Sequence, residues 1–239
     1  MGTEEKKGAI HHMSYLLFFG LIPPIALLIY VYHLDRIEKE PPKMILRLFL
    51  LGIFSVIPAI FLEGVGMTLL GLTGMPETSY VYLLIEYFLI VAFSEELSKR
   101  MIGVGMTYKS EEFNYQFDAV VYCVAAALGF ACIENIEYIM LEGPGVALGR
   151  LIPIHTICGV YMGHYVAMAK SAHRAGDFSS RAMFNFLSVL VPVLIHGFYD
   201  FSLSTENDEM LIANLVFTVV ITIVAFISLH SYAKKDKPV

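Results

Sequence analysis

The stretch VYLLIEYFLIVAFSEELSKRMIGVGM, residues 81–106, decides the fold. A membrane-spanning helix needs about 20 mainly apolar residues, and this run is long enough even though charged side chains interrupt it. Four of these lie close together, namely Glu95, Glu96, Lys99 and Arg100. An ionisable residue inside a span costs a few kcal/mol and marks a functional site by default. If the glycine-containing end continues the helix, all four lie within the bilayer. The alternative is a shorter helix whose cations reach the interface from its end.

The composition of the whole chain supports a membrane protein. The 239 residues are 57% hydrophobic and 16% charged, with mean hydropathy +0.67. A soluble domain is about 45–50% apolar and about 25% charged, so much of this surface is expected to face lipid. The net charge of −6 and the lack of a basic stripe exclude nucleic acid as an expected partner. The three cysteines form no C-x-x-C pair, so neither a disulfide framework nor a zinc knuckle is indicated.

Seven apolar segments recur along the chain. They are residues 14–32, 44–70, 80–106, 118–140, 148–170, 181–203 and 210–232. Their lengths predict an all-α, polytopic membrane protein with about seven transmembrane helices. We expect a mobile polar N-terminus over 1–13, one helical domain over 14–232 and a basic cytoplasmic tail over 233–239. Such a protein is integral to the cell membrane and crosses it several times.

Lysine and arginine residues gather in alternate connections between these segments. They are Arg36, Lys39, Lys43, Lys109, Lys170, Arg174 and Arg181, followed by Lys234, Lys235 and Lys237 in the tail. Because positive charge concentrates on the cytoplasmic side, the N-terminus is predicted to lie outside and the C-terminus inside. The segment 35–42 then lies on the cytoplasmic side, where it is expected only to carry solvated charge and to stop a helix.

The fourth segment presents a face of small residues that leads to a carboxylate. Ala127, Ala131, Glu134 and Tyr138 follow one another at steps of three and four, with Asn135 alongside. Small residues let a neighbouring helix approach closely, so Glu134 is predicted to face protein. The alternative is that Asn135 makes a hydrogen bond between helices while Glu134 lies near the outer interface.

The fifth segment carries two histidines that cannot share one site. His155 is followed by Gly159 and Gly163 at steps of four, whereas His164 lies about 180° around the helix from His155. We favour His155, which belongs to the small-residue stripe, as the functional residue. His164 is expected to be structural or interfacial.

The sixth segment pairs His196 with Asp200 one helical turn later. Asp200 could orient the imidazole or itself bind a metal ion. In the third segment, Glu95 and Lys99 are one turn apart, as are Glu96 and Arg100, so each carboxylate is expected to pair with a cation.

Depth along the helices is the difficulty in joining these groups. At 1.5 Å per residue, Glu95 lies roughly 22 Å along the third segment, whereas His155 lies roughly 9 Å along the fifth. Glu95 therefore reaches the histidines only if the third helix tilts or starts higher than the others.

Two imidazoles and several carboxylates suit hydrolysis. A catalytic zinc takes three protein ligands and activates a water in the fourth position, beside which a further glutamate serves as general base. Alternatively, glutamate and histidine activate water without metal. A rival class is a proton- or cation-coupled transporter or channel that uses the same buried groups, although the inverted repeats typical of many transporters are not visible. A non-catalytic scaffold is a third reading.

The order of the motifs resembles a known family. EELSKR (95–100), ENIEY (134–138), the histidine-glycine helix at His155 and HGFYD (196–200) resemble the PrsW family of intramembrane proteases, and LDRIEKEPP (34–42) resembles its acidic segment after the first helix. EELSKR also fits the E-E-x-x-x-R pattern of the related CAAX-type prenyl endopeptidases. Their H-x-x-x-N becomes H-x-x-x-D here, and a carboxylate is a better metal ligand than an amide but a poorer donor to an oxyanion.

The resemblance implies an intramembrane endopeptidase with catalytic carboxylates on Glu95 and Glu96. It implies metal-binding or water-positioning roles for Glu134, His155, His196 and Asp200, with Lys99, Arg100, Asn135 and Tyr138 in support. Our hypothesis is that Glu134, His155 and His196 hold zinc while Glu96 or Glu95 is the base. The metal-free mechanism stays open, because H-E-x-x-H is absent. Family substrates are membrane-anchored proteins such as anti-sigma factors, which are cut near the extracytoplasmic face.

Overall fold

A computed structural model describes residues 16–143, 153–205 and 207–239. Over these residues every named secondary-structure element is a helix, which confirms the all-α prediction. The helices are η1 (Leu16–Leu21), α2 (Ile22–Leu34), α3 (Pro42–Phe54), α4 (Val56–Gly71), α5 (Tyr80–Leu84), η2 (Ile85–Ala92), α6 (Phe93–Gly105), α7 (Gln116–Glu142), α8 (Ile154–Arg174), α9 (Phe178–Ser204) and α10 (Asp208–Lys234). The expected N-terminal segment 1–13 and the start of the fifth segment, 148–152, lie outside the described residues.

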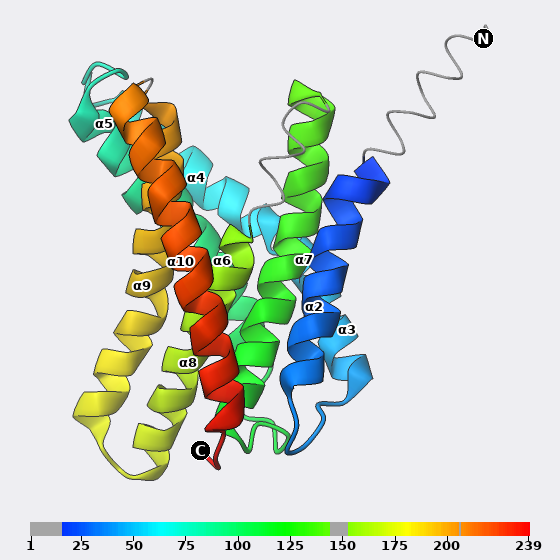
Figure 1. Cartoon of the computed structure of the whole chain (residues 1–239). Coiled ribbons are helices and arrows are strands. Elements are labelled where there is room, and N and C mark those ends of the chain that lie inside the picture. Colours follow the sequence, from blue (N-terminus) through cyan, green and yellow to red (C-terminus); the bar gives the residue numbers. More distant parts are fainter. Residues whose placement is uncertain (1–15, 144–152, 206) are drawn as a thin grey trace, which may run out of the picture.

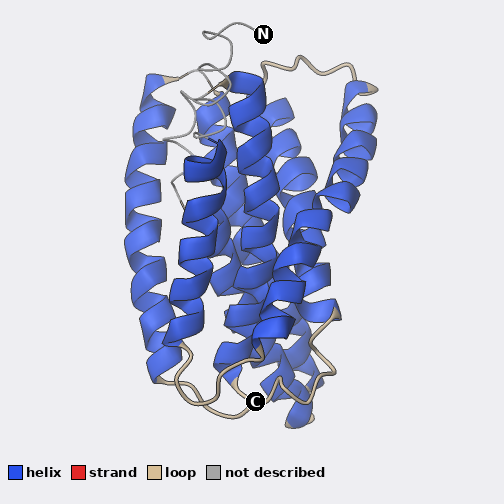
Figure 2. Cartoon of the chain, turned by 90° about the vertical axis from the view of Figure 1, so that its right-hand side faces the viewer, coloured by secondary structure: helices blue, strands red, loops and turns tan. Residues whose placement is uncertain are grey.

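The helices group into seven passes through the molecule, because η1 continues into α2, α3 into α4, and α5 through η2 into α6. Successive passes run in opposite directions, so that the α2–α3, α6–α7 and α8–α9 connections lie at one end with the C-terminus (Figures 1 and 2). Among the described residues, four passes are long and apolar enough to cross a membrane. These are Pro42–Gly71, Gln116–Glu142, Phe178–Ser204 and Asp208–Lys234.

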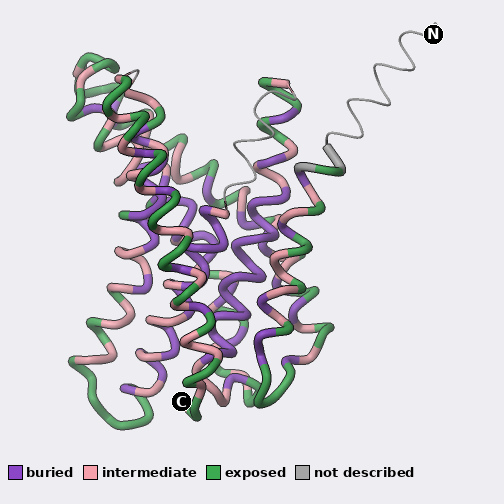
Figure 3. Tube along the Cα trace, in the orientation of Figure 1, coloured by how far each residue is buried: buried purple, intermediate pink, exposed green. Residues whose placement is uncertain are grey.

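The central helix α7 is much more deeply buried than the outer helix α10 (Figure 3). In the most apolar stretch of each, 83% of α7 is buried inside the molecule but only 17% of α10. The outer surface of α10 is lined by large apolar side chains, including Leu215 and Ile227. Exposed apolar residues on this scale mark a surface that lipid covers. The chain therefore forms an integral, multi-pass membrane protein.

Small residues allow other helices to approach the α7 backbone. A Cβ atom added at Gly163 of α8 would overlap the backbone of Ala119 and Val120, and one at Gly159 would lie 2.9 Å from the Cα of Val124. The predicted stripe of small residues after His155 therefore packs against α7, as expected from the close approach that glycine permits. This packing fixes the start of α8 beside the middle of α7.

The second pass divides into two helices at Ser55. Pro58 has no backbone N–H to donate to the carbonyl of Phe54, which weakens the helix at this point. The hydroxyl of Ser55 donates to the carbonyl of Gly52 at 2.6 Å. The sequence showed one continuous apolar segment, whereas α3 packs on α7 and α4 leans away toward η2 and α6 (Figure 1).

The third pass continues without a break to Gly105. Glu95, Glu96 and Lys99 therefore lie inside a helix and not at its end, as the long reading of the segment predicted. The π-helix η2 has hydrogen bonds from i to i+5, so it holds more residues per turn and advances less per residue than an α-helix. This shortening reduces the depth that we predicted for Glu95.

The expectation that the segment 35–42 carries only solvated charge is wrong for two of its residues. Asp35 is 1% exposed and Glu40 is 2% exposed. Both carboxylates point inward, toward Asp118 and Tyr122 at the start of α7, and Tyr122 donates a hydrogen bond to Glu40.

Candidate active site

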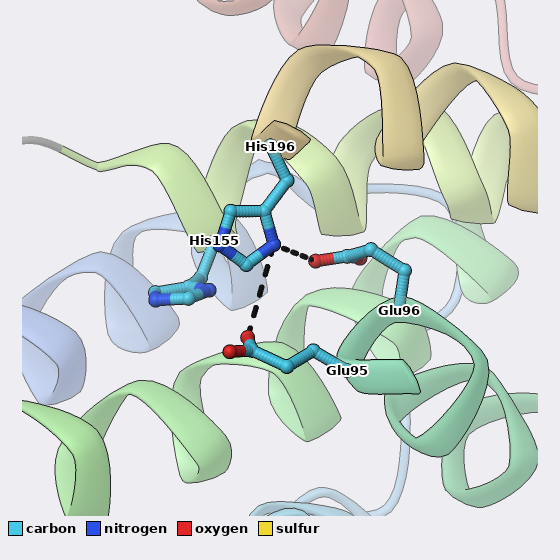
Figure 4. Close-up of side chains that lie close together, drawn as sticks. All are labelled: Glu95, Glu96, His155 and His196. Atoms are coloured by element: carbon cyan, nitrogen blue, oxygen red, sulfur yellow. Dashed lines mark hydrogen bonds and ion pairs between the residues drawn. The ribbon is translucent and has the colours of Figure 1, made fainter. Parts of the chain in front are cut away.

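Four buried side chains from three helices converge at the centre of the molecule (Figure 4). Glu95 and Glu96 come from α6, His155 from the first turn of α8 and His196 from α9. One nitrogen or oxygen atom of each lies within 4.8 Å of those of the other three. All four are buried, with exposed fractions between 0% and 7%. We call these four residues the central quartet.

Lys99 supplies the positive charge of this centre. Its Nζ lies 2.9 Å from Glu95 Oε2, 2.8 Å from Glu96 Oε1 and 3.0 Å from His155 Nδ1. An ammonium group has donors only, so Nδ1 of His155 accepts and the proton of the neutral ring lies on Nε2. The same ammonium lies 4.1 Å from the centre of the Phe130 ring, a cation–π contact.

Carboxylates also lie beside the ring nitrogens of both histidines. Nε2 of His155 is 2.5 Å from Glu134 Oε2, so the prediction that Glu134 faces protein is confirmed. Nδ1 of His196 is 2.9 Å from Glu96 Oε1, and its Nε2 is 3.1 Å from Asp200 Oδ2. Histidines in metal and catalytic centres are commonly oriented in this way by a carboxylate on the second nitrogen.

The expected pairing of Glu96 with Arg100 is wrong. The guanidinium of Arg100 donates instead to Ser188 Oγ at 2.8 Å and to Asn185 Oδ1 at 2.6 Å, both on α9. Glu96 is held by Lys99, three residues later, and by His196. Arg100 therefore joins α6 to α9 below the site and does not neutralise it.

A cavity of about 660 Å³ lies beside the central quartet. Glu95, Glu134, Tyr138 and Asp200 line it, whereas Glu96, which is 0% exposed, does not. The cavity extends along α7 and α9 to residues near their C-terminal ends, among them Glu142 and Ser204. Among the carboxylates of the quartet, Glu95 thus meets the open space.

Sequence reasoning missed Glu63 of α4, which also lines the cavity. The signal was available, because Glu63 is the only charged residue in the second half of the apolar segment 44–70. Asn135, expected in a supporting role, is buried on α7. His164 stacks on Tyr232 of α10 with ring centres 4.0 Å apart, in agreement with a structural role away from His155.

The donor set of the quartet fits a zinc ion. Zinc takes imidazole and carboxylate ligands at about 2.0–2.2 Å, so two ligands of one ion lie at most about 4.4 Å apart. The four ligand atoms, all within 4.8 Å of one another, would move slightly inward to bind it. Oε2 of Glu96 is buried without a hydrogen-bond partner, as a ligand atom awaiting a cation would be. The structure thus brings Glu95 and Glu96 together with the two histidines. Glu134 and Asp200 contact Nε2 of His155 and of His196, respectively.

Buried carboxylates and imidazoles that meet at a cavity among apolar helices suit an intramembrane hydrolase. A comparison with protein families supports this class, because the profile described as "PrsW family intramembrane metalloprotease" matches residues 40–229. The chain belongs to the PrsW family and is an intramembrane protease.

Curated relatives of this family align with the chain over most of their length. Protease PrsW of Bacillus subtilis (strain 168) is 36% identical over 193 residues, which cover 79% of this chain and 83% of the relative. That of Geobacillus kaustophilus is 34% identical over 198 residues, 82% of each chain, and that of Clostridioides difficile is 30% identical over 231 residues, 94% of each. No solved structure is significantly similar. The rival prediction of a transporter or channel finds no support in these matches.

Proposed function

We propose that the protein hydrolyses peptide bonds of membrane-anchored protein substrates at the central quartet. The observation that carries this proposal is the position of Glu95, which joins the buried quartet to the cavity. A substrate segment that enters the cavity would bring its peptide carbonyl beside this carboxylate. The expected anti-sigma-factor-like substrate stays a prediction.

Glu95 serves as the general base in this proposal. It accepts a proton from a water molecule in the cavity, whose oxygen attacks the peptide carbonyl carbon. When the carbon–nitrogen bond breaks, Glu95 passes this proton to the leaving amine nitrogen. Lys99, 2.9 Å from Glu95, holds the carboxylate in place. The peptide chain and one water are thereby converted into a carboxylic acid and an amine.

His155, His196 and Glu96 are the metal ligands that we favour, with Glu134 and Asp200 orienting the two rings. The alternative ligand set is the one expected from the sequence, in which Glu134 binds the ion directly together with His155 and His196. A bound zinc would polarise the carbonyl and lower the pKa of a water molecule to about 7.

One observation favours the metal-free mechanism. The Lys99 ammonium already contacts both carboxylates of the quartet and Nδ1 of His155, so it supplies the cation that a metal would otherwise provide. In this version Glu95 activates water in the same way, and His196 donates to the oxyanion.

The experiment that tests the function is cleavage of a single-span substrate by the purified protein in detergent. Glu95→Gln should lower the rate by about 100-fold or more, because a general base contributes about that much. Glu86→Gln is the matched control, since Glu86 lies in the same pass but does not line the cavity. Equal rates for Glu95→Gln and the wild type would refute the assigned role.

We also propose that all seven passes cross the membrane, with the N-terminus outside and the tail 233–239 inside. Thiol labelling of intact cells tests this, because the native Cys123, Cys132 and Cys158 are buried and stay silent. Glu77→Cys should react with an impermeant reagent from outside, and Lys109→Cys should not. The reverse pattern would invert the proposed orientation.

A further inference from the structure

A second group of buried carboxylates lies at the other end of the molecule from the opening of the cavity. Asp35 and Glu40 lie in the α2–α3 connection, and Asp118 lies in the first turn of α7 (Figure 1). One oxygen of each lies within 4.8 Å of those of the other two. Their exposed fractions are 1%, 2% and 0%. We call these three residues the linker cluster.

Two of these carboxylates are fixed by hydrogen bonds that each use a single oxygen. Oδ2 of Asp118 accepts from the backbone N–H groups of Asn114 at 3.0 Å and Tyr115 at 2.7 Å, which caps α7. Oε2 of Glu40 accepts from the hydroxyl of Tyr122 at 2.5 Å. The chain thus holds these carboxylates in place from outside the cluster.

Three further oxygens of the cluster have no hydrogen-bond partner in the protein. Both oxygens of Asp35 and Oδ1 of Asp118 are buried and accept no hydrogen bond. The nearby ammonium groups are engaged elsewhere, because Lys39 donates to the carbonyl of Tyr32 at 2.7 Å and Lys170 to that of Phe113 at 2.6 Å. Burying an ionised carboxylate without a partner costs several kcal/mol, so such groups are normally paired or coordinate metals.

Burial raises the pKa values of the two carboxyl groups in the α2–α3 connection. It raises the pKa of Asp35 to about 6, although the charge of Lys39 opposes the shift. Burial also raises the pKa of Glu40 to about 8, against the hydrogen bond from Tyr122. The raised pKa values mean that the ionised carboxylates are costly to bury together. A bound cation would offset this cost.

We propose that Asp35, Glu40 and Asp118 form a binding site for a hard divalent cation, Ca²⁺ or Mg²⁺. Both ions prefer carboxylate oxygens, whereas zinc sites usually include nitrogen or sulfur ligands, of which this cluster has none. The bound ion joins the α2–α3 connection to the start of α7, which is the central helix and carries Glu134 toward its other end. This inference does not depend on the proposed protease mechanism.

The test uses the full chain, purified in detergent and stripped of metal with a chelator. Ca²⁺ and Mg²⁺ are titrated separately while thermal unfolding is followed, and Tb³⁺ emission excited through tyrosine reports binding directly. Tyr122 donates to Glu40, so a lanthanide in the cluster lies close to a sensitising ring. At least one of the two ions should raise the unfolding temperature in a saturable manner.

Asp35→Asn is the decisive variant, because the carboxylate of Asp35 makes no hydrogen bond that the substitution would remove. It should weaken cation binding at least 10-fold. Its cation-free form should unfold at or above the wild-type temperature, which shows that the fold is intact. Glu111→Gln, an exposed neighbour, and Glu95→Gln, in the central quartet, should bind like the wild type.

Two results would overturn the proposal. One is that neither cation shifts unfolding nor displaces Tb³⁺ at several millimolar, which would leave a cluster whose carboxyl groups merely share protons. The other is that Asp35→Asn binds Ca²⁺ or Mg²⁺ as tightly as the wild type does.

Discussion

The central quartet buries two carboxylates and the linker cluster buries three, in different surroundings. In the quartet, Glu95 and Glu96 meet two histidines and the ammonium of Lys99, and a cavity reaches Glu95. The linker cluster has neither an imidazole nor an ion-paired cation among its described contacts, and it does not line the 660 Å³ cavity.

The difference shows what a buried carboxylate needs in order to act on a substrate. Burial alone makes the charge costly, and a fixed cation then offsets the cost. Proton transfer further requires a base that solvent and substrate reach, together with groups that orient it. Of the two clusters, the quartet meets these conditions, so we propose that it carries out the hydrolysis and that the linker cluster binds a cation.

The largest expected effect concerns the imidazoles. His196→Ala should lower substrate cleavage by about 100-fold or more, because it removes a side chain that contacts Glu96 and Asp200. Asp35→Asn, tested in the same cleavage assay, should stay within a few-fold of the wild type. If the two variants lost activity to the same degree, the contrast between the clusters would fail.

The next effect concerns the counter-charge. Lys99→Met leaves two buried carboxylates without their ammonium partner, and breaking a buried ion pair costs about 3–5 kcal/mol. Lys43→Met, at an exposed lysine near the start of α3, is the control. Denaturant unfolding in detergent should show the loss for Lys99→Met alone. Stability equal to the wild type would mean that Lys99 does not neutralise the quartet.

The smallest effect concerns Arg100, which contacts α9 instead of the quartet. Arg100→Gln should lower the free energy of unfolding by about 1–3 kcal/mol, because it removes charged hydrogen bonds to Asn185 and Ser188. Cleavage, measured where the variant is folded, should change less than for Glu95→Gln. A loss of cleavage as large as that of Glu95→Gln would place Arg100 in the site after all.

Much of the fold was predictable because membrane helices are apolar over a fixed length. The expected segment 118–140 corresponds to α7 at Gln116–Glu142, and 210–232 corresponds to α10 at Asp208–Lys234. The pairing of His196 with Asp200 was also predictable, since two residues one turn apart on a helix are neighbours.

The rest depended on contacts between distant segments. Spacing along α6 allowed Glu96 to pair with Arg100, but Lys99 and His196 occupy the carboxylate instead. The linker cluster was missed because Asp118 is 78 residues beyond Glu40 in the chain, and polar residues between helices are usually solvated. Helical periodicity does not report which connection folds against which helix.

The most direct test of the central claim is metal analysis by mass spectrometry on the same purified sample whose cleavage is measured. The account predicts about one equivalent of zinc in the wild type, and loss of both zinc and cleavage in His155→Ala and His196→Ala. Full cleavage by a wild-type preparation that contains no metal would contradict the favoured mechanism and leave catalysis to glutamate and histidine alone.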